Sequence, residues 1–151
     1  MSGIRMGDIP DIDAIYDLGE ELLAQSVYAD IKPDRVKFRT LVAGLIGQNI
    51  GTVLVVVDDQ DKPQGFLLGI VDELFFSRQR QATDLAVYVR EGYRHLAPRL
   101  LKRFIDWAES KPRTAMITLG ISSGIGNFER VGRMYENFGL APVGGIYIKR
   151  I

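Results

Sequence analysis

The chain has 151 residues, with 19 basic and 19 acidic side chains, one histidine and no cysteine. This length suits a single domain over residues 1–151, and zero net charge argues against partnership with nucleic acid or an anionic membrane. The composition also excludes disulfides, thiolate chemistry and zinc fingers and argues against any metal site, and without a membrane span or signal-peptide pattern we expect a cytoplasmic protein.

The first half of the chain shows strand and helix patterns in turn. Two segments carry apolar residues at helical spacing, and a β-branched run is followed by a polar turn and a second apolar run. The expected elements are a strand at Ile4–Met6, a helix entered at 8–11 and ending near 25, a loop at Ser26–Asp34, a helix from Pro33 or Asp34 to about Ile46, and an antiparallel hairpin of Thr52–Val57 and Gly65–Val71. In the second helix we expect Val36, Leu41 and Leu45 to face inward.

The segment Asp84–Ala108 is the most informative part of the chain. Alternating apolar residues up to Val89 predict a strand, and apolar residues at helical spacing after Pro98 predict a helix. The short basic turn between them is typical of a phosphate site, because it points backbone N–H groups and a helix N-terminus at a ligand. The other expected elements are a connecting loop or short helical turn at Glu73–Arg80, a strand Ala115–Ile121, a Gly/Ser loop, a helix from about Asn127 to Asn137 and a last strand Gly145–Arg150. The resulting order is β-α-α-β-β-β-α-β-α-β.

This order, the helix LLKRFIDWA and the ending NFERVGRMYENFGLAPVGGIYIKR resemble the GNAT acyltransferase family. The ending is the most specific part, with an asparagine, a helix ending in Met-Tyr-Glu and a Pro-Val-Gly turn. The resemblance covers nearly the whole chain, since IRMGDIPDIDAIYDLG is similar to the family's opening strand and helix. It implies an α/β (α+β) fold, with a mixed, mostly antiparallel sheet flanked by helices. It also implies transfer of an acetyl group from acetyl-CoA to a primary amine of a small molecule or protein, through direct attack and a tetrahedral intermediate.

The turn Tyr93–Pro98 departs from the family's phosphate-binding pattern of Arg or Gln, two residues, Gly, one residue, then Gly or Ala. Aligned from the helix, Ala97 takes the last small position but His95 stands at the first glycine; aligned from Arg94, the turn is two residues short. A Cβ at the position of that glycine hinders close approach to the pyrophosphate, so we expect the departure to weaken cofactor binding more than it affects the fold. The residues that the resemblance assigns to cofactor binding are Val87, Tyr88, Val89, Arg94, His95, Leu96, Ala97, Arg99 and Asn127.

The resemblance also assigns catalytic roles. Tyr135 matches the tyrosine that protonates the departing CoA thiolate, although a tyrosine beside Val131 and Phe138 on a helix face also fits a core aromatic. Asp84, expected at the start of its strand, and Glu73, on the preceding loop, are the candidate general bases, acting directly or through water. The oxyanion donor is expected to be the Val87 backbone N–H.

Asn127 matches the family asparagine that contacts the pantetheine arm, and it also fits a helix N-cap. We expect His95 beside the pyrophosphate rather than in catalysis. The loop at Phe75 and Phe76 is expected to cover the core rather than bind RNA. The rival function is a catalytically degenerate GNAT-fold scaffold that acts through a protein partner. The departure of the turn Tyr93–Pro98 from the family pattern favours the scaffold, whereas Asn127 with Tyr135 favours the enzyme. A homodimer stays open.

Overall fold

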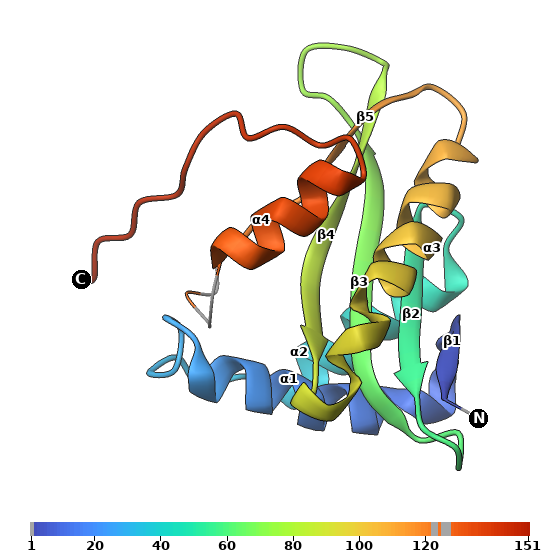
Figure 1. Ribbon diagram of the computed structural model, residues 1–151, viewed down its shortest axis with the longest axis vertical. Coiled ribbons are helices and arrows are strands. Elements are labelled where there is room, and N and C mark those ends of the chain that lie inside the picture. Colours follow the sequence, from blue (N-terminus) through green and yellow to red (C-terminus); the bar gives the residue numbers. More distant parts are fainter. Residues whose placement is uncertain (1, 122–123, 125–127) are drawn as a thin grey trace.

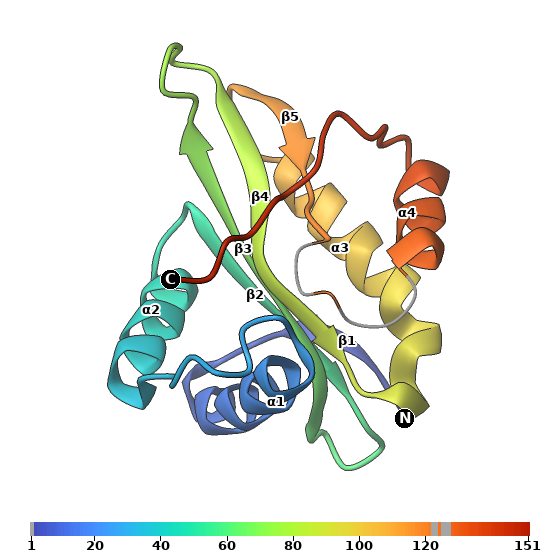
Figure 2. The ribbon, with the colours of Figure 1, turned by 90° about the vertical axis from the view of Figure 1, so that its left-hand side faces the viewer.

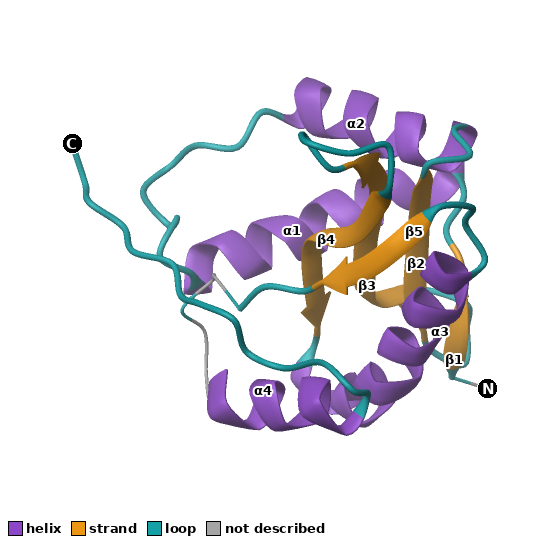
Figure 3. Ribbon diagram, turned by 90° about the horizontal axis from the view of Figure 1, so that it is seen from above, coloured by secondary structure: helices purple, strands orange, loops and turns teal. Residues whose placement is uncertain are grey.

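The computed structural model of the chain describes residues 2–121, 124 and 128–151. In this part a five-stranded sheet lies between two helical layers, α1 with α2 on one face and α3 with α4 on the other (Figures 1 and 3). The elements are β1 (Gly3–Met6), the 3-10 turn η1 (Ile9–Asp11), α1 (Ile12–Gln25), α2 (Arg35–Gly47), β2 (Gly51–Val57), β3 (Pro63–Glu73), β4 (Arg80–Val89), the 3-10 turn η2 (Glu91–Leu96), α3 (Ala97–Glu109), β5 (Thr114–Thr118) and α4 (Phe128–Asn137). Among the described residues, no helix is long and apolar enough to cross a membrane.

The strands lie in the sheet in chain order, from β1 to β5. The three pairs from β1 to β4 are antiparallel, and β4 pairs with β5 in parallel. Short turns reverse the chain between β2, β3 and β4, whereas the connection through α3 returns β5 in the same direction as β4. The expected mixed, mostly antiparallel sheet flanked by helices is confirmed.

The strand β2 divides the core between the two layers. Val53, Val55 and Val57 pack in a cluster with residues of α1 and α2, whereas Leu54 and Val56 pack in a second cluster with residues of α3. Alternate residues of a strand point to opposite faces, so a fully apolar strand must be covered on both. This explains why Thr52–Val57 reads as an unbroken apolar run.

A glycine in β3 sets how closely α3 approaches the sheet. A Cβ at Gly69 would lie 2.5 Å from the ring of Phe104, which is itself fully buried on α3. No side chain fits in that space, so the helix can lie directly on the strand. The result is a rigid base for the elements that leave β4 and α3.

The inward face of α2 differs from the expectation. Val36 and Leu41 are exposed, whereas Val42 and Leu45 are buried and Phe38 packs against them. The contact stripe is therefore Phe38, Val42 and Leu45, at the i, i+4, i+7 spacing of one helix face. The prediction for Val36 and Leu41 was wrong, and that for Leu45 is confirmed.

The hairpin of β3 and β4 is longer than expected. Glu73 pairs with Arg80, so Glu73 lies on a strand rather than a loop, and Asp84 lies in the middle of β4 rather than at its start. The tip is closed by the Leu74 N–H, which donates to the Gln79 carbonyl at 2.9 Å. Phe75 is fully exposed there, and the expectation that this loop covers the core was wrong. Cross-strand hydrogen bonds extend the pairing of β3 and β4 beyond the apolar residues from which these strands were predicted.

The strand expected over Gly145–Arg150 is not formed. Residues 141–151, here called the C-terminal arm, contain no helix or strand and are all exposed. The arm leaves α4 and projects from the body, crossing in front of the sheet edge in Figure 2. A strand needs a partner for its backbone groups, and β4 is the only strand that pairs with β5 in the described part of the chain. The last expected element was wrong for this reason.

Candidate active site

The site lies where β4 separates from β5. The parallel pairing ends at Thr83 and Thr118, whereas β4 continues to Val89. Just beyond this point β4 contains a bulge: Asp84 pairs with Gly69 and Ala86 with Leu68, which leaves Leu85 as the extra residue. A bulge bends its strand and increases the local twist, so it turns β4 away from β5. The outer edge of β4 beyond the bulge has no strand partner among the described residues.

The hydrogen-bond pattern shows which backbone groups face this open edge. The Arg90 N–H donates to the Gln64 carbonyl of the neighbouring strand segment at 3.0 Å. Because bonded and non-bonded pairs alternate in an antiparallel ladder, Tyr88 bonds toward β3, and Val87 and Val89 direct their N–H and C=O groups outward. The Arg94 Nε agrees with this direction, since it donates to the Val89 carbonyl at 3.4 Å.

Asp84 and Tyr135 are brought together by one residue between them. The Gly120 N–H donates to Asp84 Oδ1 at 3.3 Å, and the Tyr135 hydroxyl donates to the Gly120 carbonyl at 3.2 Å. Asp84 reaches this position because it projects to the same face as Ala82, which is buried in the cluster containing α3 residues. The two residues predicted as base and acid therefore share one neighbourhood.

Burial shifts the pKa of both groups. It raises the pKa of Asp84, and the hydrogen bond from the Gly120 N–H offsets part of this. Burial also raises the pKa of Tyr135 to about 12, and the nearby negative charge of Asp84 adds to the effect. Tyr135 thus keeps its proton at neutral pH, and Asp84 is a better proton acceptor than an ordinary aspartate.

Tyr135 is held by the last turn of α4. Gly139, with φ of 88°, ends the helix in the left-handed conformation, and the Leu140 N–H donates to the Tyr135 carbonyl at 3.1 Å. Val131 and Phe138 lie partly buried beside Tyr135, but no residue of α4 is fully buried. Tyr135 is thus placed by its cap and by Gly120 more than by a packed core.

The expected phosphate turn is the 3-10 helix η2. The Ala97 N–H, predicted to face a phosphate, donates instead to the Arg94 carbonyl, and the Tyr93 N–H donates to the Arg90 carbonyl. Leu96 is buried in the core, whereas Arg94 and His95 are exposed. An anion at this turn would therefore meet the side chains of Arg94 and His95 rather than the Ala97 N–H.

Further cations lie on the outer face of α3. A hollow of about 190 Å³ is lined by Ile4, Arg99, Lys102 and Arg103. Lys102 forms an ion pair with Asp106 one turn later. Arg99, predicted to bind the cofactor, thus belongs to a basic surface next to the turn.

An anchor that sequence reasoning missed fixes the end of β4. Arg90 donates to Glu21 on α1, with Nη2 and Oε2 2.8 Å apart, and its Nη1 donates to Gln64 Oε1 at 2.8 Å. The Tyr88 hydroxyl accepts a bond from Gln25 of α1 at 3.1 Å, so this side chain faces α1. Gly120 was also missed, because it acts through backbone atoms that no residue pattern marks.

Two predicted residues lie apart from this group. Glu73 is exposed at the far end of β3, four residue pairs from the pair of Gly69 and Asp84, which is roughly 13 Å along the strand. Asn127 lies outside the described residues. Within the described ranges, no group of three or more His, Cys, Asp or Glu side chains is placed to hold a metal ion.

Solved structures share the fold of this chain over its whole length. Glucosamine-6-phosphate N-acetyltransferase from Arabidopsis thaliana is 15% identical with a TM-score of 0.71, covering 100% of this chain and 98% of its own. Ribosomal-protein-alanine N-acetyltransferase from Brucella melitensis biovar Abortus 2308 is 18% identical with a TM-score of 0.68, covering 100% and 99%. The fold is that of the GNAT acetyltransferases.

A third GNAT-fold structure, described as a possible acetyltransferase from Clostridium difficile 630, is 15% identical with a TM-score of 0.72 and covers 100% of this chain and 98% of its own. No family model and no curated protein matches the sequence. The solved structures therefore show a GNAT fold at low sequence identity.

Proposed function

We propose that this GNAT-fold chain is an N-acetyltransferase, which transfers an acetyl group from acetyl-CoA to a primary amine of a small molecule or protein. The observation that carries the proposal is the linkage of Asp84 and Tyr135 through Gly120 at the point where β4 leaves β5. A proton acceptor and a proton donor stand there beside an open strand edge.

The residues present fit acetyl-CoA. The outward backbone groups of Val87 and Val89 suit an extended chain with amide groups, such as pantetheine, because it can bond to a free edge as a strand does. The contact from Arg94 to the Val89 carbonyl is long, at 3.4 Å, and a ligand amide can replace it. Arg94 and the hollow lined by Arg99, Lys102 and Arg103 offer positive charge to phosphates, and the exposed His95 offers a ring N–H.

Bound acetyl-CoA would supply the activated acyl group as a thioester. The Val87 N–H would then stabilise the negative charge that develops on the carbonyl oxygen. Asp84 would accept the proton of the substrate ammonium, directly or through water, and Tyr135 would donate a proton to the departing sulfur. The raised pKa of each group suits its role, since Asp84 holds a proton more readily and Tyr135 stays protonated.

We assign the general base to Asp84 rather than Glu73. Asp84 is partly buried and shares Gly120 with Tyr135, whereas Glu73 is exposed and lies along β3 away from that group. A partly desolvated carboxylate with a hydrogen-bonded neighbour is also better oriented for proton transfer than a solvated one.

Calorimetric titration with acetyl-CoA, followed by an assay of thiol release, tests the proposal. The chain has no cysteine, so every free thiol that appears comes from CoA. We expect binding of acetyl-CoA, and thiol release that depends on both the protein and an added amine from a panel of polyamines, amino sugars and peptides. No binding at millimolar acetyl-CoA would contradict the proposal and support the scaffold hypothesis.

A further inference from the structure

The half of β4 beyond the bulge has less support from the sheet than the half before it. Its pairing with β5 ends at Thr83, and in the described part of the chain only β3 runs beside it as far as Val89. A ligand that bonds to the outward groups of Val87 and Val89 binds best when these groups already hold their positions, because ordering them on binding costs affinity. Support for this segment has to come from outside the sheet.

The helix α1 supplies this support from one face. Tyr88 and Arg90 are two residues apart on β4, so both project to the side of α1. There the Gln25 Nε2 donates to the Tyr88 hydroxyl at 3.1 Å, and the Arg90 Nε and Nη2 lie 3.0 and 2.8 Å from Glu21 Oε2. On the opposite face Val89 packs in the cluster that contains residues of α3. The end of β4 is thus held from both faces while its edge stays open.

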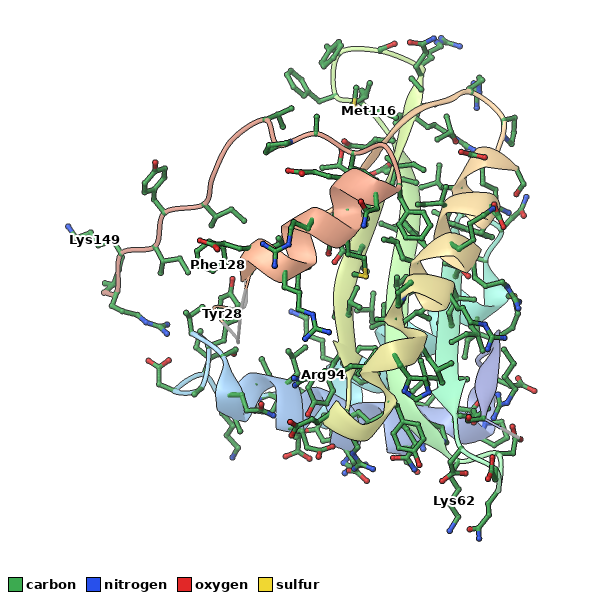
Figure 4. The ribbon with its side chains drawn as sticks, in the orientation of Figure 1. Tyr28, Lys62, Arg94, Met116, Phe128 and Lys149 are labelled. Atoms are coloured by element: carbon green, nitrogen blue, oxygen red, sulfur yellow. The ribbon has the colours of Figure 1, made fainter. Side chains whose placement is uncertain are left out.

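Arg90 also reaches β3 and the turn before it. Its Nη1 donates to Gln64 Oε1 at 2.8 Å, and the Gln64 Nε2 donates in turn to Asp58 Oδ2 at 2.9 Å. Asp58 Oδ1 accepts the backbone N–H groups of Gln60 and Lys62, and Lys62 marks this turn in Figure 4. A guanidinium has only donors, so the Gln64 oxygen must face Arg90 and its NH₂ must face Asp58. Arg90 therefore ties β4 to α1, to β3 and, through Gln64, to the turn between β2 and β3.

The backbone of Arg90 fixes where η2 begins. The Arg90 N–H donates to the Gln64 carbonyl at 3.0 Å, and the Arg90 carbonyl accepts from the Tyr93 N–H at 2.9 Å. Arg94 follows within η2, and Figure 4 shows it beside the end of β4. A shift of Arg90 would therefore displace both the open strand edge and the cation of the turn.

We propose that Arg90 is a positioning residue for acetyl-CoA, an inference that rests on the proposed function. Through Glu21 and Gln64 it holds the edge of β4 and the start of η2 where the cofactor meets them, and it takes no part in the proton transfers. Its Nε, Nη1 and Nη2 already have protein partners, so it does not serve as a phosphate ligand. The Arg90 and Glu21 side chains are 42% and 40% exposed, so their pair adds little to global stability and its loss leaves the fold intact.

Arg90→Met, which keeps the aliphatic stem and removes every side-chain bond, is the first test. Calorimetry should show an acetyl-CoA Kd raised by about tenfold, with a matching rise in KM and a kcat within about twofold of wild type. Arg90→Lys should recover only part of the affinity, because one ammonium cannot replace the planar fork. The control Arg39→Met removes an exposed ion pair between α2 and Asp13 of α1, at 3.0 Å, and should change neither constant. Full recovery in Arg90→Lys would reduce the role of Arg90 to its charge and would overturn the proposal.

Glu21→Gln separates positioning from direct phosphate binding by the sign of its effect. If Arg90 positions the edge, weakening its bond to Glu21 should weaken acetyl-CoA binding. If Arg90 instead bound a phosphate, its release from Glu21 should strengthen binding. Glu20→Gln makes the same charge change at the neighbouring exposed residue of α1 and corrects for long-range electrostatics. Tighter binding by Glu21→Gln than by Glu20→Gln would overturn the proposal.

Amide hydrogen exchange of the ligand-free protein gives a readout that does not depend on activity. In Arg90→Met the amides of residues 88 and 90 should exchange faster than in wild type, whereas those of β2 should be unchanged. Faster exchange with an unchanged Kd would make Arg90 a structural residue only, which would overturn this inference and leave the proposed function standing. A wild-type protein that bound no acetyl-CoA would contradict the proposed function, and the positioning role with it.

Discussion

The helices α3 and α4 are both amphipathic, yet they are buried to very different degrees. α3 buries five residues against the sheet, where Gly69 lets Phe104 come close, whereas α4 buries none. The pattern of a helix thus predicts which face is apolar, but the surface beneath decides how far that face is buried. Asp84 stands on the well-packed half of the molecule and Tyr135 on the loosely packed half, with Gly120 between them.

The largest expected effect tests the packing difference itself. Phe104→Ala should lower the free energy of unfolding by about 3–5 kcal/mol, because it leaves a cavity under α3. Phe138→Ala, just beyond α4 and only partly buried, should cost less than about 1 kcal/mol, since its site is already partly open to water. Urea unfolding of both variants measures the contrast, and equal losses would contradict it.

A second substitution separates chemistry from packing on α4. Tyr135→Phe keeps the ring but removes the proton donor, so turnover should fall by about 100-fold while the melting temperature and the affinity for acetyl-CoA change little. Steady-state thiol release measures the rate, and Tyr147→Phe on the exposed arm is the matched control. A Tyr135→Phe variant as fast as wild type would make Tyr135 a packing residue only.

On the well-packed half, Asp84→Asn should lower the rate at neutral pH and recover part of it at higher pH, where more substrate amine is already neutral. Glu73→Gln, an exposed control, should leave the profile unchanged. Rate profiles across the neutral and mildly alkaline range check this. A loss of rate in Glu73→Gln with Asp84→Asn unaffected would move the base to Glu73.

The raised pKa of Asp84 also predicts how the melting temperature of Asp84→Asn differs from wild type as pH changes. Burial raises the folded-state pKa of Asp84 above its ordinary value of 3.8, so ionisation favours the unfolded chain, and stability is lost as pH rises from about this value through the folded pKa. Asp84→Asn should therefore melt higher than wild type near neutral pH. The difference should disappear below the unfolded pKa, where both side chains are neutral. A lower melting point at neutral pH would contradict the assigned burial.

The smallest effect concerns the turn before α3. Arg94→Glu should weaken acetyl-CoA binding by about 1 kcal/mol, because a charge-assisted phosphate contact becomes repulsive. Arg78→Glu, at the exposed hairpin tip, makes the same charge change away from the site and should have little effect. Calorimetric titration compares the two, and equal affinities would remove Arg94 from the site.

Local patterns predicted the elements that local interactions determine. The β-branched run of β2 and the helical spacing of α3 gave their positions closely, since both follow from which faces are buried. Gly145–Arg150 has an equally good strand pattern but no adjacent strand, so its outcome depended on a partner that the pattern does not contain. The inward orientation predicted for Val36 was wrong because apolar residues occur on both faces of α2, so the sequence does not mark which face is buried.

For the site, the resemblance supplied Asp84, Val87 and Tyr135, and the structure places Asp84 and Tyr135 near each other and Val87 on the open edge. It did not indicate Gly120, which acts through its N–H and C=O, nor the bulge, because Leu85 fits the apolar alternation of a regular strand. Contacts made by the backbone and irregular pairings leave little mark on side-chain type. The Gly120 contacts and the bulge therefore could not be predicted from the sequence.

The bulge at Leu85 makes the length of β4 as important as its composition. A chain lacking this one residue would pair Ala86 next to Asp84 and form an uninterrupted ladder with β3. Such a strand would be straighter and would have less reason to part from β5. Most substitutions in β4 would alter a side chain, but this deletion would close the space between two strands. The extra residue interrupts the ladder with β3 and bends β4 just beyond the point where its pairing with β5 ends.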